Sequence, residues 1–205
     1  MTFDLICVGG GFAGLTAAVR AAELGLRTAV VERGAGEHYM CNSRVCTGVT
    51  HIAFLNPEEP EDVLYDQIQA AAAGTARDEL ARCFAVNGAR TIAWLTEHGA
   101  KFGDAPHRYR GPPMLVPARE MRAGLDWEQS GPNLFLKELC RRFEAAGGDM
   151  LTETEAVALA MANDACIGLD VVGPSGAAGL QTTAVVLADG GFQAGHELLA
   201  RHVTS

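Results

Sequence analysis

The stretch from Phe3 to Glu32, FDLICVGGGFAGLTAAVRAAELGLRTAVVE, constrains the fold of this chain more than any other. It opens with an apolar run, Phe3–Val8, which is short and typical of a buried strand. An alanine-rich helical pattern from Phe12 to Leu24 follows and ends at a glycine. A second apolar run, Thr28–Val31, is followed directly by the acidic residue Glu32. Strand, helix and strand in this order predict an α/β fold of the Rossmann-like type, with a parallel sheet and helices on both faces.

Three glycines, Gly9, Gly11 and Gly14, form a GxGxxG motif between the first strand and the helix. The first permits a tight turn, the second lets a pyrophosphate approach the backbone, and the third lets the helix pack closely on the strand. The helix N-terminus adds N–H groups and a partial positive charge. Glu32 follows Gly14 by 18 residues, where a carboxylate can accept both ribose hydroxyls of an adenosine and repel the 2′-phosphate of NADP. The predicted cofactor contacts of this region are Gly9, Gly10, Gly11, Phe12, Ala13, Gly14, Glu32 and Arg33.

The motif alone does not separate FAD from NAD, but the segment that follows it differs from an ordinary NAD domain. A polar patch, Asn42–Ser43–Arg44, precedes Gly48 in a loop where such a domain usually proceeds to another helix and strand. Ser43 and backbone N–H groups can bind further phosphate oxygens, and Arg44 can add a charge-assisted hydrogen bond. The alternative is an ordinary surface loop.

Three segments, ICVGGGFAGLTAAVRAAELGLRTAVVER, NSRVCTG and AVVLADGGF, together resemble the flavoprotein family of fumarate reductase and succinate dehydrogenase. A fourth, TIAWLTEHGAKF, resembles a helix that recurs in that family. Within that family, the resemblance points to the soluble, single-subunit dehydrogenases and reductases acting on carboxylic acids or steroids. The resemblance implies an FAD-binding fold of the glutathione-reductase type, with the glycine motif on the pyrophosphate and Glu32 on the ribose. It also implies flavin-side contacts by Asn42, Ser43 and Gly48, an adenine contact by the backbone of Ala156, and a second passage of the chain past the cofactor at Ala188, Gly190 and Gly191.

Three positions depart from the family pattern. Asp189 stands where a threonine is usual, which places a carboxylate near a diphosphate, and Val49 stands where a second glycine is usual. Asn42 occupies the position at which the membrane-bound enzymes carry the histidine that bonds covalently to FAD. An amide cannot form that bond, so the resemblance implies FAD that is held noncovalently.

The rest of the chain predicts further elements of the same fold. Helices are expected over residues 63–73, 77–98 and 132–146, a loop over 104–118, and a strand in MLTETEAVAL. The segments CIGLDVVG and LQTTAVVLA predict a hairpin. Right-handed crossovers place strand 3–8 between strands 27–32 and 184–189. The basic stretch contains His107, Arg108, Arg110, Arg119 and Arg122, which form either a carboxylate-binding site or, as we favour, a solvated loop.

Composition excludes several classes of protein. The 205 residues are 48% apolar and carry a formal charge of −9, so the chain can bury a core and repels nucleic acid. No stretch approaches the length of a membrane span, and the first apolar run contains Asp4 and is too short for a signal peptide, so we expect the cytoplasm. The six cysteines form no CxxC pair. Cys41 and Cys46 with His38 and His51 fit no zinc pattern, so we expect no metal.

The resemblance also bears on how much of an enzyme is present. Family members run to roughly twice this length, with a cap domain and a returning segment that carry the substrate and proton-delivery residues. We therefore expect residues 1–205 to be one partial FAD-binding domain, whose partner is a C-terminal half or a second copy through an open sheet edge. Two functions remain open: part of a flavin-dependent oxidoreductase acting on a C–C bond beside a carboxylate or ketone, or a non-catalytic nucleotide-binding or interaction module. No catalytic residue is assigned, and we expect no turnover by this chain alone.

Overall fold

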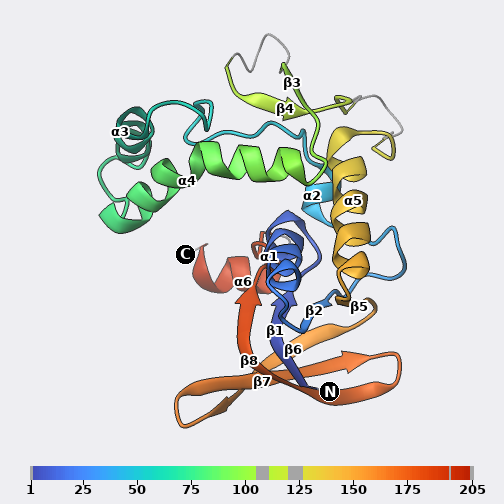
Figure 1. The fold of residues 1–205 in the computed structure, drawn as a ribbon. Coiled ribbons are helices and arrows are strands. Elements are labelled where there is room, and N and C mark those ends of the chain that lie inside the picture. The colour runs from blue at the N-terminus through green and yellow to red at the C-terminus, as the bar shows by residue number, and fades with distance from the viewer. Residues whose placement is uncertain (1, 105–110, 120–126, 194, 204–205) are drawn as a thin grey trace. The chain divides into compact units, whose positions relative to one another are not determined.

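Strand β1 (Thr2–Val8) lies inside a six-stranded sheet of order β5-β2-β1-β8-β7-β6 in the described part of the chain (Figure 1). The computed structural model describes residues 2–104, 111–119, 127–193 and 195–203. These fall into two compact units, residues 1–42 with 139–205 and residues 43–138. Each unit is described by itself below.

The first unit is built on the sheet. Its parallel strands are β5 (Asp149–Leu151), β2 (Thr28–Val31), β1 and β8 (Gly176–Leu187). Strand β8 then pairs antiparallel with β7 (Ala165–Gly173), which pairs antiparallel with β6 (Glu155–Ala162). The strand order confirms the predicted central position of β1 between β2 and β8.

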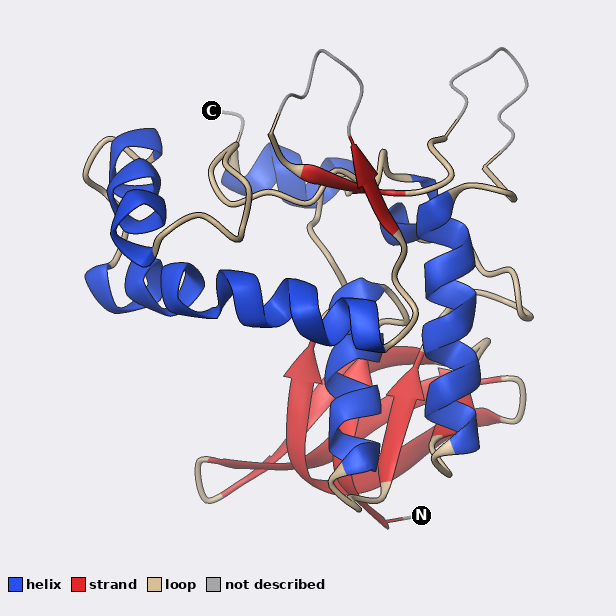
Figure 2. Ribbon diagram, turned by 45° about the horizontal axis from the view of Figure 1, so that its top comes forward, coloured by secondary structure: helices blue, strands red, loops and turns tan. Residues whose placement is uncertain are grey.

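Apolar packing on the strands explains why β1 and β2 read as continuous hydrophobic runs. All four residues of β2 are buried, as expected of a parallel strand covered on both faces. One cluster joins Ile6 and Val31 to Leu169, Val171 and Leu180 of the antiparallel strands. Helix α1 (Phe12–Glu23) contacts β1 and β2 and buries its own Leu15, Ala18 and Val19 (Figure 2). Helix α6 (His196–His202) follows β8.

The second unit contains most of the remaining helices. They are α3 (Glu61–Ala71), α4 (Asp78–Glu97) and the N-terminal half of α5 (Gly131–Ala145). Helices α3 and α4 pack on each other, and a two-stranded sheet of β3 (Phe102–Asp104) and β4 (Pro113–Leu115) accompanies them. In the described residues, no helix is both long enough and apolar enough to cross a membrane.

Three local predictions are wrong. The expected strand MLTETEAVAL is two strands, because Glu153 has a positive φ of 54° and turns the chain between β5 and β6. The expected loop 104–118 contains β4, whose partner β3 ends at Asp104. The loop around Asn42 contains a short helix, α2 (Asn42–Val45). Elements α2, β3 and β4 each have only three or four residues, too few to show a period.

Candidate dinucleotide site

The carboxyl ends of three adjacent parallel strands meet at the glycine motif. In the sheet register, Val8 of β1 lies opposite Val31 of β2 and Leu187 of β8. The Gly9 N–H donates to the Val31 carbonyl at 2.8 Å, and the Ala188 N–H donates to the Val8 carbonyl at 2.8 Å. Gly9, Glu32 and Ala188 directly follow these strands and therefore lie together at the carboxyl end of the parallel sheet. Ligands of open α/β sheets bind just outside the carboxyl ends of the strands.

Two of the motif's glycines have no room for a side chain. Gly9 has a φ of +101°, and a Cβ there would lie 2.5 Å from the Ala188 carbonyl oxygen. A Cβ on Gly14 would overlap the carbonyl oxygen of Gly9, because the first turn of α1 crosses β1 closely. Gly11 is the N-cap of α1 and has no side-chain capping bond. The loop thus leaves the backbone at the start of α1 open to approach by a phosphate.

Glu32 is buried, with 7% of its surface exposed, and both its carboxylate oxygens are held by the main chain. The Gly10 N–H donates to Oε2 at 2.9 Å and the Gly34 N–H donates to Oε1 at 2.7 Å. A carboxylate offers about four lone-pair positions, so these two bonds leave acceptors for further donors. The carboxylate is therefore fixed beside the glycine loop and can still accept hydroxyl groups.

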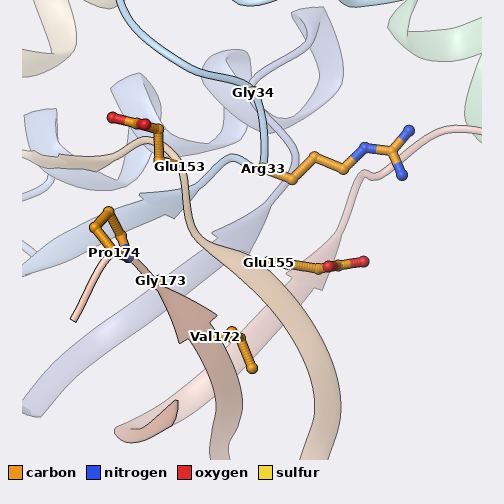
Figure 3. A pocket seen from close by; sticks show the side chains of 7 residues that line it. All are labelled: Arg33, Gly34, Glu153, Glu155, Val172, Gly173 and Pro174. Atoms are coloured by element: carbon orange, nitrogen blue, oxygen red, sulfur yellow. The ribbon is translucent and has the colours of Figure 1, made fainter. Parts of the chain in front are cut away.

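A hollow of about 600 Å³, open to solvent, lies next to the segment that follows β2. Arg33 and Glu155 extend toward one side of it and Glu153 toward the other (Figure 3). The chain is joined here by backbone bonds, since the Glu153 N–H donates to Gly34 and the Thr154 N–H to Glu32, both at 3.0 Å. The hollow is lined by Arg33, Gly34, Glu153, Glu155, Val172, Gly173 and Pro174. Ala156 lies two residues beyond Thr154 on β6, so this predicted adenine contact is near Glu32 in the fold.

The predicted contacts at the end of β8 divide into two groups. Ala188 is packed against the glycine loop, and the Cα of Asp189 also lies only 2.9 Å from where a Cβ on Gly9 would be. Gly190 and Gly191 are exposed, and Gly190 has a φ of +87° with open space around it. Ala188 therefore belongs to the floor of the loop, whereas the glycine pair lies on the surface beyond it.

Asn42, Ser43, Arg44 and Gly48 lie at or beyond the boundary between the units, and the last three belong to the second. Asn42 is exposed, and Ser43 is half-buried. Arg44 is fully buried, donates a hydrogen bond from Nη1 to Oδ1 of Asn133, and places its guanidinium 5.8 Å from the centre of the Trp127 ring. The role of these four residues at a cofactor remains a prediction.

Gly48 is a glycine for reasons within its own unit. It has a φ of +82°, and a Cβ there would lie 2.9 Å from Cγ of Pro132 and 3.1 Å from Cβ of Leu115. Its carbonyl accepts the Leu115 N–H at 2.9 Å, and the neighbouring Val49 forms a bridge with Met114. Gly48 thus lets the chain after α2 pack closely on β4 and on the start of α5.

Of the basic stretch, His107, Arg108, Arg110 and Arg122 lie outside the described residues. Arg119 is described and half-buried, and its Nε is buried without a hydrogen-bond partner among the residues that the structure covers. Burial raises the pKa of the nearby Cys46 thiol, while backbone hydrogen bonding and the charge of Arg119 act in the opposite direction. Within the described ranges, no three His, Cys, Asp or Glu side chains are grouped to hold a metal ion.

The FAD binding domain family matches the chain over residues 4–205. The chain belongs to this family. The glycines without room for a Cβ and the carboxylate held at the end of β2 fit the pyrophosphate and ribose of such a dinucleotide. No curated protein matches this FAD-binding chain by sequence.

Solved structures of flavoproteins share the fold. The 3-ketosteroid-Δ4-(5α)-dehydrogenase of Rhodococcus jostii RHA1 matches this FAD-binding chain with a TM-score of 0.81 at 18% identity, over 98% of this chain and 48% of the enzyme. A flavocytochrome c3 fumarate reductase matches with a TM-score of 0.76 at 20% identity, over 98% and 36%. The 3-ketosteroid Δ1-dehydrogenase of Sterolibacterium denitrificans gives 0.75 at 16% identity, over 98% and 50%. The chain therefore spans half or less of the length of these enzymes.

Sequence reasoning missed one side chain at this site. Tyr39 is buried, with 3% of its surface exposed, and its hydroxyl donates to the Gly10 carbonyl at 2.6 Å. The two residues are 29 positions apart, and HYM in an otherwise polar loop has no periodic pattern that points to this contact.

Proposed function

We propose that the chain is the FAD-binding part of a flavin-dependent oxidoreductase, with residues 1–205 forming one partial domain. The observation that carries the proposal is the Glu32 carboxylate, held by two backbone N–H groups beside a glycine loop that excludes side chains. In this arrangement Glu32 accepts the ribose hydroxyls, the start of α1 meets the pyrophosphate, and the segment around Ala156 meets the adenine. When bound, FAD supplies a hydride acceptor or donor.

The proposed reaction is oxidation or reduction of a C–C bond beside a carboxylate or ketone. Its support is the fold shared with a fumarate reductase and two 3-ketosteroid dehydrogenases. Arg119 supports it further, since a buried guanidinium nitrogen without a partner among the described residues can receive a carboxylate oxygen. A second candidate is a non-catalytic nucleotide-binding module, which the 48% coverage of the Rhodococcus enzyme motivates.

The proposal includes the cofactor's attachment and partners. FAD is held noncovalently, because the exposed side chain at position 42 is an amide. The further partner is a C-terminal half or a second copy, and the edge strand β6 offers unpaired backbone groups for it. The proposed location is the cytoplasm.

Flavin titration tests the proposal. The purified chain should quench the fluorescence of added FAD with one site per chain, and acid precipitation should leave all flavin in the supernatant. Flavin fluorescence in the protein band of a denaturing gel would refute noncovalent binding, and lack of quenching would refute FAD binding itself. Oxidation of reduced benzyl viologen with fumarate or a ketosteroid enone then separates the two candidates when a C-terminal half is supplied, because only the enzyme then sustains turnover above the rate of free FAD. The chain alone should give none.

A further inference from the structure

We infer that Tyr39 is a positioning residue for the pyrophosphate, acting through the peptide group between Gly10 and Gly11. The inference rests on the proposed FAD binding. Tyr39 lies outside the glycine motif. It lies in the loop after β2, and its hydroxyl reaches back to the carbonyl of Gly10 at 2.6 Å.

The Gly10 residue is held at both of its backbone polar groups. Its N–H donates to Oε2 of Glu32 at 2.9 Å, and its carbonyl accepts the Tyr39 hydroxyl. Both bonds are buried, so water does not compete for them. The glycine has neither a Cβ nor a helical hydrogen bond to restrain it, and these two side chains supply the restraint instead.

Because a peptide group is planar, fixing the Gly10 carbonyl also fixes the direction of the Gly11 N–H. The Gly10 carbonyl and the Gly11 N–H belong to one planar peptide, which is trans, so they point to opposite sides of the chain. Tyr39 is 97% buried and draws the carbonyl toward the protein interior. The Gly11 N–H consequently points away from the interior, at the N-cap of α1, where the dinucleotide phosphates are proposed to bind.

The position of the Tyr39 side chain is fixed by close packing against Gly10 and Gly34. A Cβ on Gly10 would lie 2.7 Å from the Tyr39 hydroxyl oxygen and 2.9 Å from Cζ. A Cβ on Gly34 would lie 2.5 Å from Cβ of Tyr39. The two glycines that donate to Glu32 are thus the two that make room for Tyr39. Sγ of Cys140 lies 3.5 Å from the hydroxyl oxygen, and since the hydroxyl donates to Gly10, the thiol is the donor in that contact.

The test measures FAD affinity and the ³¹P spectrum of bound FAD in Tyr39→Phe. Loss of one buried hydrogen bond should weaken FAD about fivefold to tenfold. The two phosphate resonances should also shift, which a purely structural loss distant from the phosphates would not produce. The matched control is Tyr65→Phe on α3, which also removes one tyrosine hydroxyl, there bonded to Asp78 at the surface. It should leave affinity and spectrum unchanged.

Gly10→Ala is the second variant, in case Tyr39→Phe does not fold. Its Cβ displaces the Tyr39 hydroxyl, so it should weaken FAD as well, and Tyr39→Phe added to it should weaken FAD little further. Fully additive losses, or an affinity of Tyr39→Phe within twofold of wild type with unshifted phosphate resonances, would overturn the role of Tyr39 and leave FAD binding intact. Failure of the wild-type chain to bind FAD would instead overturn the proposed function and this inference with it.

Discussion

Glu32 in the first unit and Arg44 in the second are both buried charged side chains, with 7% and 0% of their surfaces exposed, and both are predicted to contact the cofactor. Their surroundings differ. Main-chain N–H groups of two glycines hold Glu32, which leaves acceptor positions on each oxygen. Arg44 donates to the side chain of Asn133 and lies over the ring of Trp127. The buried Glu32 carboxylate, held by backbone N–H groups, keeps hydrogen-bond acceptors for a ligand. The buried Arg44 guanidinium uses its hydrogen bond to Asn133 to stabilise its own unit.

The comparison therefore predicts separable effects. Changes at Glu32 should act on FAD binding, changes at Arg44 should act on stability, and a change at Gly14, where the loop packs on the sheet, should act on both.

Gly14→Ala should produce the largest loss. Its Cβ overlaps the Gly9 carbonyl, and because the atoms in its way belong to the backbone they cannot rotate aside, so we expect a loss of about 3 kcal/mol in the free energy of unfolding and no detectable FAD binding. Chemical denaturation and FAD titration measure the two quantities. The control is Gly179→Ala in β8, where a Cβ meets no atom within 4 Å. Equal behaviour of the two variants would contradict the close crossing of α1 over β1.

Arg44→Met should lower the free energy of unfolding by about 2–3 kcal/mol, because it leaves the buried Oδ1 of Asn133 without its charged donor. Arg77→Met is the control, since Arg77 forms an exposed ion pair with Glu79 and its loss should change stability by less than about 0.5 kcal/mol. FAD affinity of folded Arg44→Met should stay within threefold of wild type. A loss of tenfold or more would instead support direct contact of Arg44 with the cofactor.

Glu32→Gln should weaken FAD about tenfold to a hundredfold while leaving the fold intact. The amide can accept from only one of the Gly10 and Gly34 N–H groups and offers a donor where the ribose needs an acceptor. Titration with FAD and with riboflavin separates the contributions of the adenosine and flavin ends of the cofactor, since only FAD carries the adenosine ribose whose hydroxyls donate to Glu32. Glu197→Gln on α6 is the control for loss of one carboxylate. Unchanged FAD affinity in Glu32→Gln would disprove the ribose contact.

The smallest expected effect is on the pH dependence of stability and involves Cys7 on β1, which contacts neither Glu32 nor Arg44 in the bonds given above. Burial raises the pKa of this thiol from 9.0 to about 11. The folded state therefore keeps its proton in the range where the unfolded state loses it, so the contribution of this thiol to stability should be constant below pH 9 and fall as pH rises from 9 to about 11. Unfolding of wild type and Cys7→Ala at pH 8 and pH 10.5 measures this. An equal decline in both would remove Cys7 as its source.

Sequence patterns were sufficient for the first strand, helix and strand because each has a full local period. Gly9, Gly14 and Glu32 follow from the same local pattern, and the rule for right-handed crossovers placed β8 beside β1. The split between β5 and β6 was not predictable, because a non-glycine residue, Glu153, adopts a positive φ there. Such a conformation leaves no mark in the hydrophobic pattern.

The part of the site that escaped prediction depends on contacts between distant segments. Tyr39 reaches a carbonyl 29 residues earlier, and nothing adjacent to it in sequence indicates that bond. Likewise, the polar patch at Asn42–Ser43–Arg44 is compatible with a phosphate site or a surface loop. Only the fold shows that its arginine is buried against Asn133.

The pairing of β1 with β8 also matters while the protein is being made. Thr2 pairs with Gln181, 179 residues later, and Ala188 follows at the floor of the glycine loop. At a ribosomal rate of about 5–20 residues per second, roughly 10–35 s pass between synthesis of the two strands. During that interval β1 can pair with β2 alone and presents an apolar, unpaired edge. The nascent chain thus carries its dinucleotide loop long before the strand that completes it has left the ribosome.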